Sequence, residues 1–164
     1  MGDKRWKPNV TVAAVIEQEG RYLLVEEMTS RGLRLNLPAG HLEAGESLLE
    51  GVVREVLEET MRPFEPQALV SIQMGRLLPR GDEDITFLRF AFTGTVQAPW
   101  PGRVYDSPVV ANHWLSWDEL EACQARHRSH FVRESVQLYR EGHRHSLSLL
   151  HTDPSVYAVG PAGG

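Results

Sequence analysis

Residues 37–62, which read LPAGHLEAGESLLEGVVREVLEETMR, join a glycine-containing turn to a regularly patterned segment. From Leu49 to Val56 the apolar side chains recur at i, i+3, i+4 and i+7, which is the spacing of one helix face. A glutamate and a serine stand where an N-cap is expected, and Pro63 prevents the helix from continuing far beyond its last turn. The pattern predicts an amphipathic helix over residues 46–60.

Three carboxylates gather on one face of this predicted helix. Glu55, Glu58 and Glu59 are spaced i, i+3 and i+4, so they repel one another. They also lie in its C-terminal half, where the helix dipole disfavours anions. A sequence that breaks two stability rules at one place often serves function there. Because clustered oxygen ligands suit hard cations, we expect a Mg²⁺ site, with Mn²⁺ as a substitute.

The neighbouring residues complete this constellation. Arg54 can pair with Glu46, which would hold the helix start against the preceding turn. Gly40 and Gly45 give that turn backbone freedom, so that the carbonyl of Ala39 can face the metal. A solvated surface helix also carries many paired Glu and Arg residues, so the carboxylate spacing alone is not specific.

The whole segment resembles the Nudix box, G-x5-E-x7-R-E-U-x-E-E-x-G-U, in which U is a bulky aliphatic residue. Every charged position of that pattern is present at the right spacing. The matching residues are Gly40, Glu46, Arg54, Glu55, Val56, Glu58 and Glu59. Met61 and Arg62 depart from the pattern, because the family has glycine and an aliphatic residue there. A left-handed Met61 would cost about 1 kcal/mol or more, unless the helix ends differently, for which Pro63 offers another stop.

The resemblance to the Nudix family implies a fold and a set of roles. The fold would be of the α/β (α+β) class, an α/β/α sandwich with a central mixed sheet. Glu55 and Glu59 would be the leading metal ligands, followed by Glu58 and the Ala39 carbonyl. The remaining site residues would be Glu46 and Arg54, as the structural salt bridge. A box glutamate or a distant loop carboxylate would act as general base.

The remainder of the chain favours the same architecture, because strands, a helix, more strands and further helices follow one another. Strands are expected at residues 9–16, 21–26, 68–74, 85–92 and 112–115, with the first two forming a hairpin. Loops are expected at residues 29–33, 79–84 and 99–108, and helices at residues 117–124 and 130–141. Residues 1–153 are interpreted as one domain, followed by a mobile tail at residues 154–164.

Residues outside the box supply candidates for substrate binding. Arg34 and Arg89 could hold phosphates, since arginine suits that anion, although surface ion pairs would explain them equally well. Glu83, Asp84 and Asp106 are loop acids that could provide a base or an extra metal ligand. Asp106 is the first choice among them, and it is counted with the substrate-binding residues.

Composition excludes several classes of protein. The chain of 164 residues has 17 basic and 22 acidic residues, which give a formal net charge of −5, so no overall basic field grips nucleic acid. No apolar run approaches the roughly 20 residues of a membrane helix. The single cysteine, Cys123, fits a reducing cytoplasm. We expect a cytoplasmic monomer or homodimer whose partner is a small phosphoanhydride substrate.

The family resemblance extends over residues 6–150 and is greatest to the NudJ-type phosphatase branch. It is carried by WKPNVTVAAVI, LLVEE, NLPAGHLE, TFLRF and RESVQLYREG. This branch implies Mg²⁺-dependent release of phosphate from nucleoside tri- and diphosphates, or from the diphosphate of the thiamine pyrimidine precursor. One alternative is a pyrophosphohydrolase of another nucleoside diphosphate-X compound. Another is a catalytically silent ligand sensor, although silent versions usually lose box carboxylates that this chain keeps.

Overall fold

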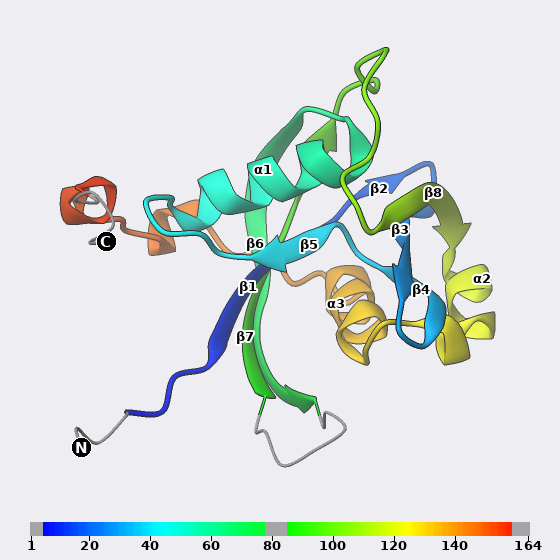
Figure 1. Ribbon diagram of the computed structural model, residues 1–164, viewed down its shortest axis with the longest axis horizontal. Helices are drawn as coiled ribbons and strands as arrows, with labels where there is room; N and C mark the ends of the chain where they lie inside the picture. The colour runs from blue at the N-terminus through cyan, green and yellow to red at the C-terminus, as the bar shows by residue number, and fades with distance from the viewer. Residues whose placement is uncertain (1–4, 78–84, 159–164) are drawn as a thin grey trace.

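A mixed four-stranded sheet forms the centre of the computed structural model, which describes residues 5–77 and 85–158 (Figure 1). Its strand order is β5 (Ala39–His41), β1 (Asn9–Val15), β7 (Ile85–Val96) and β6 (Phe64–Leu77). β1 runs parallel to β7, whereas β5 and β6 are antiparallel to their neighbours. The predicted mixed sheet is therefore confirmed.

One helix packs on each face of the mixed sheet. On one face, Val12 packs with Val52 and Val56 of α1 (Leu48–Thr60). On the other face, Val15 shares a buried cluster with Val132 and Val136 of α3 (Phe131–Arg140). In Figure 1, α1 lies above β1 and α3 lies to the right of β1 and β7. The alternation of inward side chains along β1 thus builds the expected α/β/α sandwich.

A second, antiparallel sheet flanks the sandwich, and the sequence interpretation did not anticipate it. It contains β2 (Glu17–Gln18), β3 (Arg21–Thr29), β4 (Gly32–Asn36) and β8 (Val109–Ser116). The central β3 pairs with all three other strands. The short helix α2 (Trp117–Ala122) and the turn η1 (Gln124–Arg126) follow β8.

Two local predictions in this region were only partly right. The hairpin predicted between residues 9–16 and 21–26 is confined to the end next to its turn, where β2 pairs with the start of β3 and the Ile16 carbonyl accepts the N–H of Leu23. The rest of β1 takes β7 as its neighbour. Residues 29–33 are not an open loop, since Thr29 and Gly32 are paired across a tight turn between β3 and β4. Gly32 has a φ of 83°, which suits that turn.

The remaining elements agree in kind with the sequence interpretation, but several strands are longer than predicted. Two short 3₁₀ turns, η2 (Leu147–Leu149) and η3 (Pro154–Tyr157), close the described chain. The second turn lies inside the predicted tail, whereas residues 159–164 and the predicted turn at 79–84 lie outside the described residues. Within the described ranges, no helix is long and apolar enough to span a membrane.

Candidate active site

The helix α1 begins and ends as its sequence requires. Ser47 is the N-cap, and its side chain and that of Glu50 each accept a backbone N–H from the other residue. At the other end Met61 has a φ of 60°, so a methionine occupies the left-handed position where the family pattern has glycine. These caps fix the thirteen residues that carry the box carboxylates.

Arg54 ties α1 to the turn that precedes it. Its Nε and Nη2 donate to the two carboxylate oxygens of Glu46, at 2.9 and 2.8 Å, and Nη2 also donates to the carbonyl of His41 at 3.0 Å. This arrangement raises the pKa of Arg54 and holds the pKa of Glu46 below its usual value. The predicted pairing of Glu46 with Arg54 is therefore present in the structure.

The three box carboxylates divide between two partners. Nη1 of Arg54 donates to Glu55 at 2.8 Å and to Glu58 at 3.1 Å. Glu59 instead accepts a hydrogen bond from the backbone N–H of Ala39 at 2.9 Å. Ala39 therefore contacts this acid through its amide. Glu55 and Glu59 are buried, whereas the side chain of Glu58 is 37% exposed. Two acids therefore face the β5 segment, while the third lies closer to solvent.

Burial disfavours the charged forms of the two inner acids. It raises the pKa of Glu59 to about 9, assisted by the nearby charges of Glu27, Glu55 and Glu58 and opposed by the Ala39 amide. Burial also raises the pKa of Glu55, although Arg54 opposes this shift. A cation bound between these carboxylates would favour their ionised forms.

Gly40 is needed for a reason that differs from the expected one. It does not have a positive φ, whereas Gly45 does, with a φ of 86°. A Cβ at position 40 would lie 2.1 Å from Oε1 of Glu55. Gly40 thus provides the space in which the Glu55 carboxylate packs against the backbone.

The chemistry of these residues suits a hard divalent cation, but in the structure they do not form a complete ligand set. The donors are oxygen atoms of buried glutamates beside the Ala39–His41 strand. Among the described residues, no three His, Cys, Asp or Glu side chains lie close enough together to hold a metal ion. Glu55 and Glu58 bond Arg54, whereas Glu59 bonds the Ala39 amide. The ligand roles of Glu58 and the Ala39 carbonyl stay predictions.

A buried guanidinium lies near these acids. Arg89 on β7 is 7% exposed, and its Nε and Nη1 have no hydrogen-bond partner among the described residues. Its charge is within electrostatic range of Glu27 and Glu59, while burial lowers its pKa to about 10. The ring of Phe131 lies 4.9 Å from its Cζ. The sequence interpretation selected Arg89, but it did not predict this degree of burial.

Glu27 is a buried acid that the sequence interpretation missed. It accepts a hydrogen bond from Nδ2 of Asn36 at 3.2 Å and lies 3.6 Å from Nη1 of Arg128. A signal was available, since Leu23, Val25 and Glu27 alternate along β3 and strand alternation places them on one face. The predicted strand ended at residue 26, so this alternation was not applied to Glu27.

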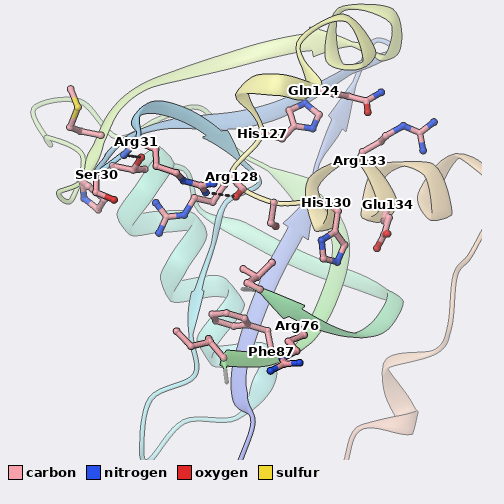
Figure 2. Close-up of a pocket in the computed structure, with 16 residues that line it drawn as sticks. Ser30, Arg31, Arg76, Phe87, Gln124, His127, Arg128, His130, Arg133 and Glu134 are labelled. Carbon is pink, nitrogen blue, oxygen red and sulfur yellow. Dashed lines mark hydrogen bonds between the residues drawn. The ribbon is translucent and has the colours of Figure 1, made fainter. Parts of the chain in front are cut away.

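A cavity of about 1290 Å³ lies next to Glu27, because Arg128, the partner of Glu27, lines it (Figure 2). Figure 2 shows Arg31 and Arg128 together on one side of it and Phe87 on the other. The side chain of Arg31 donates to the carbonyl of Arg128 at 3.3 Å. Phe87 precedes Arg89 by two residues on β7, although Arg89 itself does not line the cavity. The turn after β3 and the segment after η1 build this basic wall, which their sequence gave no reason to bring together.

Comparison with known proteins shows which family has this arrangement. A model of the NUDIX domain matches residues 6–135. The chain belongs to the Nudix family. It is 37% identical to phosphatase NudJ of Escherichia coli strain K12 over 146 residues, which cover 88% of this chain and 92% of that protein. This Nudix chain is thus a hydrolase that acts on phosphoanhydrides.

Solved structures agree with the Nudix assignment. A NUDIX hydrolase from Nitrosomonas europaea matches with a TM-score of 0.85 and 45% identity, covering 90% of this chain and 98% of that one. The MutT protein from Methanosarcina mazei Go1 has a TM-score of 0.63 and 24% identity, over 82% of this chain and 96% of that one. The second likeness shows the shared fold alone.

The structure places the other candidates of this Nudix site less centrally. Nη1 of Arg34 donates to the carbonyl of Leu33 at 2.8 Å, and Arg34 does not line the cavity. Asp106 is exposed, but its backbone N–H donates to the carbonyl of Glu58 at 3.1 Å, so its loop does reach the box helix. Glu83 and Asp84 lie outside the described residues.

Proposed function

We propose that this protein is a Mg²⁺-dependent phosphohydrolase that releases phosphate from nucleoside tri- and diphosphates or from the diphosphate of the thiamine pyrimidine precursor. The observation that carries the proposal is the pair of buried carboxylates, Glu55 and Glu59, set against the Ala39–His41 strand. The likeness to a protein named as a phosphatase supports release of phosphate. Mn²⁺ would replace Mg²⁺, because both prefer oxygen ligands.

Different residues of the site would bind the metal, orient the carboxylates and accept a proton. When bound, Mg²⁺ supplies positive charge to the phosphate oxygens and lowers the pKa of a water molecule. Glu55, Glu59 and Glu58, with the Ala39 carbonyl, would hold the ion. Arg54 orients Glu55 and Glu58 from one side, as its two hydrogen bonds indicate. A box glutamate, or Asp106 from its loop, would accept the proton of the attacking water.

The cavity next to Glu27 suits an anionic substrate. Arg31 and Arg128 lie on its wall, and Phe87 offers an apolar surface opposite them. A phosphoanhydride with an attached ring system combines the two chemistries that these side chains accept. Arg34 and Asp106 stay proposals as substrate-binding residues. We also propose a cytoplasmic location and a monomeric or homodimeric state.

A hydrolysis panel tests the proposed function. Nucleoside di- and triphosphates, the pyrimidine diphosphate and a sugar nucleotide are incubated with Mg²⁺ or with chelator, and phosphate and pyrophosphate are measured separately. We expect phosphate release that requires the metal, and Glu55→Gln and Glu59→Gln are each expected to lower kcat about a hundredfold or more. Glu65→Gln, at an exposed position on β6, serves as the control.

Two results would contradict the proposal. Full activity of Glu55→Gln and Glu59→Gln would remove the assignment of the site. Release of pyrophosphate alone, from a nucleoside diphosphate-X compound, would replace the phosphatase by a pyrophosphohydrolase.

A further inference from the structure

The protein offsets the burial of the Arg89 charge only in part. The side chain is 7% exposed, and two of its three guanidinium nitrogens lack a hydrogen-bond partner among the described residues. A buried charge with unmade hydrogen bonds is strongly unfavourable. Thr11 stands beside Arg89 on the neighbouring strand β1, and its buried hydroxyl also lacks a partner there. Two neighbouring strands therefore present unused donors at one point.

The acids near Arg89 are already engaged elsewhere. Glu27 accepts the amide of Asn36 and faces Arg128, and Glu59 accepts the amide of Ala39. Neither acid forms an ion pair with Arg89, although both act on its charge from a distance. The guanidinium thus interacts electrostatically with both acids and forms a hydrogen bond with neither.

The surroundings of Arg89 hold it in a fixed position. Gln73 is its cross-strand neighbour on β6, and Gln73 accepts the hydroxyl of Ser135 at 2.7 Å and donates to Glu134 at 3.3 Å. Phe131 lies against the guanidinium at 4.9 Å. α3 therefore supports the Arg89 side chain from one side, while its buried Nε and Nη1 have no partner among the described residues.

We infer that Arg89, with the hydroxyl of Thr11, binds a phosphoryl group of the substrate and so selects for a phosphoanhydride. The inference rests on the proposed function and adds the residues that recognise the anion. Phosphoryl oxygens supply the acceptors that Arg89 and Thr11 lack, and desolvation strengthens each bond. Gln73, Ser135 and Phe131 are positioning residues for Arg89, because they contact the arginine or its neighbour.

Binding of inorganic pyrophosphate without metal tests this inference apart from hydrolysis. Calorimetry in the presence of chelator compares the wild-type protein with Arg89→Met and with Arg89→Lys. We expect Arg89→Met to bind about tenfold to a hundredfold more weakly, since it loses charge-assisted hydrogen bonds. Arg89→Lys keeps the charge but not the donor geometry, so its affinity should lie between the other two.

Thermal unfolding separates recognition from support of the fold. Arg89→Met removes a desolvated charge, so its melting temperature should equal or exceed that of the wild type. Arg140→Met is the control, because Arg140 also lies over an aromatic ring, that of Trp117 at 4.7 Å, but is exposed and not buried. It should bind pyrophosphate like the wild type.

The outcomes distinguish this inference from the proposed function. Equal pyrophosphate binding by the wild type and Arg89→Met, including no binding by either, overturns the role of Arg89 and leaves hydrolysis untouched. If Arg89→Met lowers the melting temperature and leaves pyrophosphate binding unchanged, Arg89 has a structural role. That result also overturns its role in binding. If the wild-type protein hydrolyses no substrate but binds pyrophosphate, and Arg89→Met weakens that binding, the proposed reaction is wrong and the anion site is supported.

Discussion

At the scale of single residues, Gly40 and Gly94 both lack room for a side chain, but for different reasons. A Cβ at Gly40 would meet the carboxylate of Glu55 at 2.1 Å, which is the end of a side chain that can move. A Cβ at Gly94 would lie 1.9 Å from the backbone carbonyl oxygen of Glu65 on the neighbouring strand β6. The same substitution should therefore act on the site in one case and on the fold in the other.

We expect Gly40→Ala to lower kcat at least about tenfold while the melting temperature changes little, because only Glu55 has to shift. Gly94→Ala should destabilise the protein by about 2 kcal/mol or more, because two strands must separate. Phosphate release and thermal unfolding of both variants provide the measurement. A Gly40→Ala protein that is fully active would mean that the position of the Glu55 carboxylate is irrelevant to the reaction.

Residue patterns explain why the site was only partly predictable. The box carboxylates follow from helical spacing, and the pairing of Arg54 with Glu46 follows from the same segment. Glu27 and the cavity residues Arg31 and Arg128 lie on other segments, so only tertiary structure brings them near the box. Sequence periodicity describes one element at a time and does not contain these contacts.

At the scale of elements, α1 was predicted accurately because its caps and its apolar face are both local signals. The pairing of strands was not, because neighbouring segments such as β1 and β3 look like a hairpin but belong to different sheets. Their period-2 patterns identify them as strands without naming their partners. The turn between them therefore predicted a full hairpin, whereas the structure keeps this pairing only next to the turn and pairs β1 with β7.

An ion pair between elements gives the stability of the antiparallel sheet a pH dependence. Glu26 on β3 bonds Nε2 of His113 on β8 at 2.9 Å and also pairs with Arg126 in η1. The hydrogen bond with His113 is the main reason that the pKa of Glu26 falls below 4.5. The resulting stabilisation is fully present above pH 4.5 and is lost as the pH falls through the lower folded pKa.

Glu26→Gln should therefore lower the free energy of unfolding at neutral pH by about 1 kcal/mol, and the deficit should shrink below pH 4.5. Denaturant unfolding of the variant and the wild type across this range measures the effect. Glu65→Gln, at an exposed position on β6, should show no comparable deficit. A deficit that is constant with pH would show that the charge of Glu26 is unimportant.

At the scale of the whole molecule, the proposed metal would join two layers of the sandwich, since its ligands come from α1 and from β5. A ligand that binds only the folded state stabilises it, by about 2.7 kcal/mol at a hundred times its Kd. Mg²⁺ should therefore raise the melting temperature by several degrees, and Glu59→Gln should reduce the shift. Calorimetric scans over a range of Mg²⁺ concentrations test this, and an equal shift in Glu59→Gln would remove Glu59 from the ligand set.

The parallel pairing of β1 with β7 also bears on how the protein is made. β1 occupies an inner position of the mixed sheet, yet its register runs from Asn9–Phe87 to Val15–Thr93, so its neighbour on one side is encoded about eighty residues later. On the ribosome the apolar segment that includes Val12 and Val15 must wait, without its parallel neighbour, until β7 emerges. Such long-range pairing slows folding, and the first strand to be synthesised is among the last to be completed.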